Sequence, residues 1–205
     1  LRTRRGACQA SAQKVLDWVL TLQRSDGAFW TNEHRIQVFT HAHCYALEGL
    51  LYGYHFFGEK KYLRGLIDGG RVLLQLQRAD GSLYHIYDDQ RIICRMFWRM
   101  FPRKTSDATA QAIRLWLALS NIEDDNSYIN AAKNSALFLH EMQENKLEGK
   151  SVQNGGIYHK RTDLFLYKYY TSIMSTWCSQ FSLIAFYYLL GDNQPSVKTI
   201  SEDLF

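Results

Sequence analysis

Apolar residues recur along the chain in helix-length runs, and three of these runs end in the same way. Each finishes at a glutamine, followed by a polar turn with glycine and then an aromatic or apolar tail. The three copies are 15–23 with 26–30, 72–77 with 80–84, and 136–143 with 154–158. Repeats of this length are supersecondary units that bury their apolar face only by stacking on one another. The pattern therefore predicts an architecture more firmly than a chemistry.

Three further runs, 40–52, 106–119 and 175–189, alternate with the glutamine runs. They open with hydroxyl or acidic residues suited to helix N-caps and are apolar nearly all round, which is typical of helices buried on every side. The glutamine runs keep one polar face. We therefore predict outer helices at 7–24, 59–78 and 126–145, and inner helices at 40–57, 105–120 and 172–190. The repeats are then 7–57, 59–120 and 126–190, in one domain or part of one over 1–205, with a tail at 191–205.

Strand-like alternation is confined to residues 82–100. There, 83–87 and 91–94 flank Asp88-Asp89-Gln90, which predicts a small hairpin within a loop.

The repeats resemble those of a known group. Gln23-x-x-x-Gly27-x-Phe29 and Gln77-x-x-x-Gly81-x-Leu83 look like the Q-x-x-x-G-x-W repeats of terpenoid cyclases and their protein prenyltransferase relatives. That α/α toroid is shared by six-hairpin glycosidases, several polysaccharide lyases and the C-terminal domain of glucuronyl epimerases. The resemblance implies an all-α toroid in which Gln23, Phe29 and Gln77 tie an outer helix to the turn after it. Three hairpins are part of a ring, so we expect either a missing N-terminal part or copies of the chain in a homo-oligomer to complete it.

The composition argues against a nucleic-acid-binding or membrane-spanning protein. The 205 residues are 46% hydrophobic, enough for one sizeable core, and the net charge of +4 comes from scattered basic residues rather than one basic face. We therefore expect no nucleic-acid partner. Cys44 and Cys178 lie in apolar runs and are expected to be buried free thiols, which favours a reducing, cytoplasmic compartment. The longest apolar run, 181–190, is too short to cross a bilayer.

In a toroid the N-terminal ends of the inner helices meet at one mouth, where helix dipoles favour anionic ligands. We predict His41 and His43 there as an acid or base, with capping or core histidines as the alternative. Their rings point to different sides of a helix, so they do not bind one metal, and we predict neither metal nor cofactor. Asp107 shares a helical stripe with Gln111 and serves either catalysis or capping. The other candidates for substrate binding are Trp177, Gln180, Trp98, Arg91 and Asp89.

A buried carboxylate in the first inner run adds a structural expectation. Glu48 lies between leucines, so it needs a partner, and His41 and Arg114 are the candidates.

Three function hypotheses follow. The first is a polysaccharide hydrolase, lyase or epimerase acting on uronate-containing chains: His41 or His43 as base, Tyr84 as acid and Arg91 or Arg95 against the carboxylate. If the reaction is hydrolysis, Asp107 and Asp89 would supply the two carboxylates. The second is an isoprenoid-binding cyclase-like domain. The chain lacks the D-x-D-D acid motif and the Asp-x-Cys zinc ligands of that group. The third is a non-catalytic scaffold.

Overall fold

A computed structural model describes residues 2–143, 155–164, 167–170 and 173–191 of the chain. The helices are α1 (Arg2–Thr21), α2 (Thr40–Phe57), α3 (Lys60–Leu76), α4 (Ile92–Met100), α5 (Ser106–Glu123), α6 (Asn126–Glu141) and α7 (Thr176–Leu190). The strands are β1 (Gln37–Phe39), β2 (Leu83–Tyr84), β3 (Ile86–Asp89), β4 (Arg103–Thr105), β5 (Lys160–Leu164) and β6 (Tyr167–Tyr170).

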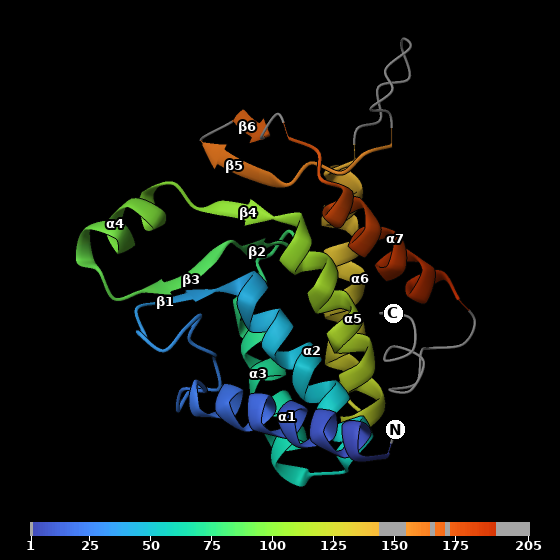
Figure 1. Ribbon diagram of the computed structural model, residues 1–205. Helices are drawn as coiled ribbons and strands as arrows, with labels where there is room; N and C mark the ends of the chain where they lie inside the picture. The colour runs from blue at the N-terminus through green and yellow to red at the C-terminus, as the bar shows by residue number, and fades with distance from the viewer. Residues whose placement is uncertain (1, 144–154, 165–166, 171–172, 192–205) are drawn as a thin grey trace.

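The long helices form three hairpins in two layers within the described residues (Figure 1). The inner helices α2, α5 and α7 lie side by side, because α5 packs against both α2 and α7. The outer helices α3 and α6 lie behind α2 and α5 in the view of Figure 1, and α1 runs across the lower end of α2 and α3. The chain is thus mainly helical, with the alternation of outer and inner helices that the sequence predicted.

The repeated glutamines join successive repeats. The side-chain amide of Gln23 donates to the Gly27 carbonyl in the turn at 3.1 Å and to the Gly65 carbonyl in α3 at 2.9 Å. Gln77 donates to the Ala131 carbonyl of α6 at 2.7 Å and to the Ser135 hydroxyl at 2.9 Å. Each glutamine therefore reaches the next outer helix, a contact that holds neighbouring hairpins together.

The repeated turn glycines fit where no side chain would. Gly81 has φ +81°, and a Cβ built on it would lie 2.1 Å from the Asn134 carbonyl oxygen of α6. Gly27 has φ +93° and approaches the Asp68 carbonyl of α3 in the same way, at 2.6 Å. The turn backbone thus packs directly on the next outer helix, which explains why the repeated turn contains a glycine.

The expected hairpin between 83–87 and 91–94 is wrong. β1 pairs antiparallel with β3, and β2, β4, β5 and β6 form a four-stranded antiparallel sheet in that order. Residues Ile92–Met100 form α4 instead of a strand. Partners from distant loops, which no local pattern indicates, determine this pairing. All these strands lie at the end of the bundle where α2 and α5 begin (Figure 1).

The inner helices differ in burial. Every residue of α5 from Ser106 to Ser120 is buried, because helices cover it on several sides. α7 departs from the expectation of burial on every side: it exposes Trp177, Leu183, Tyr187 and Leu190. It packs on α5 and α6, and its remaining face is open among the described residues.

Cys44 and Cys178 are buried free thiols, as predicted. No helix in the described ranges has both the length and the apolar character of a bilayer-crossing segment.

Candidate active site at the mouth of the inner helices

The first two inner helices, α2 and α5, each begin against the loop of the following repeat. The Thr40 N–H, at the start of α2, donates to the His85 carbonyl at 3.1 Å. The Ser106 N–H, at the start of α5, donates to the His159 carbonyl at 3.0 Å. These bonds satisfy helix N–H groups that have no partner within the helix. They also bring two loop histidines to the mouth.

A second repeated contact decides the role of His43. Three equivalent side chains, His43, Thr109 and Ser179, each accept the N–H of a turn residue: that of Phe29 at 3.2 Å, of Leu83 at 3.2 Å and of Ile157 at 3.3 Å. The other ring nitrogen of His43 donates to the Gly69 carbonyl at 3.1 Å. Burial, partly offset by this bond, lowers the pKa of His43 to about 4. Both ring nitrogens are engaged with backbone, so the geometry gives His43 a structural role.

Asp107 is the centre of the mouth. Its Oδ2 lies 3.2 Å from Nε2 of His159 and 3.5 Å from Nδ1 of His41. Its Oδ1 accepts hydrogen bonds from the Thr105 hydroxyl and from the Ala108 N–H, the latter at 2.7 Å. Burial alone would raise the pKa of Asp107, but the His159 hydrogen bond, the charge of His41 and these donors together lower it. An ionised carboxylate thus lies between two imidazoles.

Cationic and imidazole groups continue from this cluster onto the sheet. Lys160 Nζ lies 3.3 Å from Nε2 of His85. Burial, reinforced by the Lys160 charge, lowers the pKa of His85 to about 4. Burial also lowers the pKa of Lys160, against the attraction of Asp107. His85 therefore stays neutral near pH 7.

Aromatic rings border the mouth on the inner helices. The ring of Tyr45 meets that of His41 edge-on at 4.5 Å and that of Trp177 at 6.5 Å. Tyr45 is 38% exposed and Trp177 57% exposed, so both offer faces to a ligand. Flat apolar faces of this kind stack on sugar rings as well as on other planar groups.

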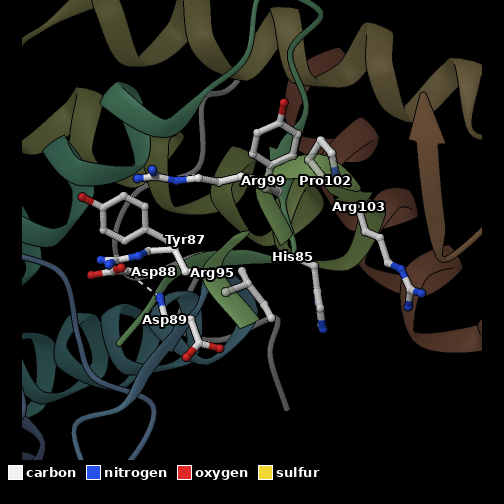
Figure 2. A pocket seen from close by; sticks show the side chains of 10 residues that line it. His85, Tyr87, Asp88, Asp89, Arg95, Arg99, Pro102 and Arg103 are labelled. Atoms are coloured by element: carbon white, nitrogen blue, oxygen red, sulfur yellow. Dashed lines mark hydrogen bonds between the residues drawn. The ribbon is translucent and has the colours of Figure 1, made fainter. Parts of the chain in front are cut away.

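A pocket of about 260 Å³ opens beside the cluster, between β3, α4 and β4. His85 belongs to both the pocket and the cluster. In Figure 2 the guanidinium groups of Arg95 and Arg99 lie on the side of Tyr87, and Arg103 lies on the side of His85. The other lining residues are Tyr84, Ile86, Asp88, Asp89 and Pro102.

Below the mouth, between the inner helices, lies a buried ion pair. Arg114 of α5 donates to Glu48 of α2 at 2.7 Å, and Gln111 donates to the same carboxylate at 3.3 Å. Burial raises the pKa of Glu48 although Arg114 and Gln111 oppose the shift. Glu48 has the partner Arg114 that the sequence offered, and Gln111 is part of this interior network.

The structure brings together only some of the other predicted residues. Asp89, the last residue of β3, forms an ion pair with Arg91 at 2.8 Å, and Asp89 also lines the pocket. Tyr84 is in β2, where its carbonyl accepts the Thr40 hydroxyl. Gln180 is exposed on α7. Trp98 is in α4, and its side chain lies outside what the structure describes.

Several mouth residues were given no role from the sequence, chiefly His159, Lys160, Cys178 and Tyr45. One signal in the repeats singles out His159. Gly81-Ser82-Leu83-Tyr84-His85 and Gly155-Gly156-Ile157-Tyr158-His159 place Tyr-His at the same distance from the turn glycine. The first copy has threonine at this position, which conceals the pattern.

No protein-family model matches the sequence, and comparison with curated proteins finds no match. Solved structures do resemble the fold. The unsaturated glucuronyl hydrolase of Bacillus sp. GL1, responsible for the degradation of glycosaminoglycan, matches with a TM-score of 0.58 and 16% identity over 84% of this chain and 49% of that one. An inactive variant of an α-1,6-mannanase from a Salegentibacter species, in complex with α-1,6-mannotetrose, matches with a TM-score of 0.58 and 12% identity over 88% of this chain and 63% of that one.

These likenesses show the class of fold, an α/α toroid, which agrees with the fold implied by the resemblance of the repeats. The chain spans about half of the glucuronyl hydrolase and under two thirds of the mannanase. At these identities the likeness is one of fold, and the chemistry has to be argued from the residues at the mouth.

Proposed function

We propose that this chain is a carbohydrate-active enzyme, or a domain of one, that binds an anionic, uronate-containing polysaccharide at the mouth of the inner helices. The observation that carries the proposal is the position of Asp107, held as a carboxylate between His41 and His159 where the inner helices begin. Both similar structures are of enzymes that act on sugar polymers, one of them on a glucuronyl substrate.

Three features of the mouth support an anionic sugar. Helix N-termini and the lysine beside His85 make it favourable for negative charge. The adjoining pocket presents Arg95 and Arg99, and neither forms an ion pair in the described part of the chain. Guanidinium groups bind carboxylates through paired, charge-assisted hydrogen bonds. Tyr45 and Trp177 offer ring faces to the sugar.

His41 is the group we assign to proton transfer. The His41 side chain lies at the mouth and is 25% exposed. Its Nδ1 faces the carboxylate of Asp107. A carboxylate beside an imidazole favours one orientation of the ring by electrostatic attraction, as in catalytic dyads of other enzymes. Asp107 is therefore a positioning residue for His41. Abstraction of the C5 proton of a uronate is the step that one such imidazole serves. In elimination the C4–O bond then breaks and the leaving oxygen takes up a proton, and in epimerisation a proton returns to C5 on the opposite face.

The test measures binding and turnover with a panel of polyuronates and a neutral mannan. We expect the uronate polymers to bind and to be converted, which would appear as unsaturated uronate absorbance or as C5 inversion by NMR. His41→Gln should lower kcat by about 100-fold or more with little change in KM. Preferential binding of the neutral mannan, or unchanged turnover in His41→Gln, would overturn the proposal.

A further inference from the structure

Three side chains with different donor atoms meet beside the proposed proton-transfer group. The Asp107 carboxylate, the His159 imidazole and the Cys178 thiol place one donor atom each within 4.8 Å of the others. Asp107 is in the first turn of α5, Cys178 is in the first turn of α7, and His159 immediately precedes β5. The packing of α5 against α7 brings the two helix starts together.

The spacing is close to that of a tetrahedral zinc site. Two ligand atoms on one zinc ion, each about 2.0–2.3 Å from the metal, lie roughly 3.3–3.7 Å apart. Asp107 Oδ2 and His159 Nε2 are 3.2 Å apart. The thiol sulfur lies within 4.8 Å of both atoms, so it has to approach by about 1 Å at most to complete the set.

The backbone around the donors is fixed. The His159 carbonyl accepts the Ser106 N–H at 3.0 Å, and its own N–H donates to the Ile173 carbonyl at 3.1 Å. Cys178 is 1% exposed and cannot leave the cluster without disturbing α7. Ligands held on rigid elements in this way are preorganised for a metal.

A second observation points to a missing group at the same place. Nδ1 of His41 is buried at the atom level and has no hydrogen-bond partner within the described residues, although it lies 3.5 Å from Asp107 Oδ2. Buried polar atoms without a partner are rare in folded proteins. A water molecule bound to a metal beside Asp107 would give this nitrogen a partner.

We propose that Asp107, His159 and Cys178 bind a divalent cation of the zinc class, with a fourth position open to water or to a substrate oxygen. Zinc accepts sulfur, nitrogen and oxygen donors together, whereas calcium and magnesium require oxygen ligands. Three protein ligands and one open position are typical of catalytic zinc sites. Neither the sequence spacing nor the fold likeness indicates this site, and His41 stays outside the ligand set.

The metal inference is independent of the sugar substrate and is tested without one. The full chain is freed of metal with a chelator and titrated with Co²⁺, which takes zinc sites and reports its ligands by absorption. We expect saturable binding at one site with a thiolate-to-cobalt charge-transfer band in the near ultraviolet. Added Zn²⁺ should abolish the band by competition.

Variants separate this site from adventitious binding. Cys178→Ser should remove the charge-transfer band and weaken binding by more than about 100-fold, and His159→Gln should weaken it comparably. Cys44→Ser is the matched control, because Cys44 is also a buried thiol on an inner helix but lies outside the donor cluster. It should keep both band and affinity.

Three results would overturn the inference: no saturable Co²⁺ binding, a spectrum without a thiolate band, or equal affinity in His159→Gln and the unaltered chain. The last comparison holds even if Cys178→Ser fails to fold, since His159 is partly exposed. A chain that binds polyuronates but not Co²⁺ would refute the metal site alone. A chain that binds Co²⁺ but no polyuronate would refute the proposed function alone.

Discussion

Arg114 of α5 donates to Glu48 of α2 at 2.7 Å, and both side chains are almost completely removed from solvent, at 1% and 8% exposure. The two residues occupy the same position in successive inner helices, seven residues after Asp107 and His41 respectively. The pair ties these helices below the mouth. It therefore fixes the distance between the elements that carry the proposed site.

Arg114→Met should destabilise the fold strongly, because it leaves the Glu48 carboxylate buried without a countercharge. We expect a loss of about 3–5 kcal/mol in the free energy of unfolding, measured by urea denaturation. The double variant Glu48→Leu/Arg114→Met removes both charges and should recover most of that loss. Additive losses in the double variant would show that the two charges do not act as a pair.

Gln77→Ala should cost more stability than its neighbour Gln75→Ala. Gln77, which directly follows α3, makes two hydrogen bonds to α6, whereas Gln75 is exposed in the last turn of α3. The expected losses are about 2 kcal/mol for Gln77→Ala and less than about 0.5 kcal/mol for Gln75→Ala, read from urea midpoints. Equal losses would contradict the role of the glutamine as a link between hairpins.

Gly81→Ala should be far more damaging than Gly58→Ala. Both glycines have positive φ, +81° and +69°, so both variants carry backbone strain of about 1 kcal/mol. Only at Gly81 would the new Cβ meet backbone, the Asn134 carbonyl oxygen at 2.1 Å, while nothing lies within 4 Å at Gly58. The difference in thermal unfolding temperature between the two variants measures the close approach of turn and outer helix. Similar temperatures would mean that α6 moves away at little cost.

The stability of the chain should fall below pH 6.5 because of His43. In the folded chain its pKa is about 4, so between pH 6.5 and about 4 the unfolded chain binds a proton there and the folded chain does not. Lowering the pH from 6.5 to about 4 should reduce the free energy of unfolding by about 3 kcal/mol through this residue. Above pH 6.5, His43 should not change the free energy of unfolding. Urea unfolding at pH 7 and pH 5 should show a smaller pH dependence in His43→Gln. An unchanged dependence would place the titrating group elsewhere.

The helices were predictable because each carries its own pattern. The inner run at 106–119 is apolar on all sides, and the structure buries the whole of α5 from Ser106 to Ser120. The resemblance of the repeats implied that Gln23 and Gln77 tie an outer helix to the turn after it; Gln23 does so through the Gly27 carbonyl, whereas the printed contacts of Gln77 are to the next outer helix, α6. Local sequence is enough for such elements.

The mouth was only partly predictable, because it depends on contacts between distant repeats. His41 and Asp107 were expected there from the helix starts, and they do lie together. His159 reaches Asp107 only because its carbonyl holds the start of α5. His43 looked like a catalytic candidate beside His41, but its equivalence to Thr109 and Ser179 is visible only once the turns are in place.

Calorimetric titration of the full chain with a polyuronate oligosaccharide and with a neutral mannooligosaccharide of equal length tests the central claim most directly. If the mouth and its arginine pocket recognise an anionic sugar, the uronate should bind more than about tenfold more tightly. Arg95→Gln/Arg99→Gln should abolish most of that preference. Equal affinity for the two sugars, or a preference that survives the double variant, would contradict the account.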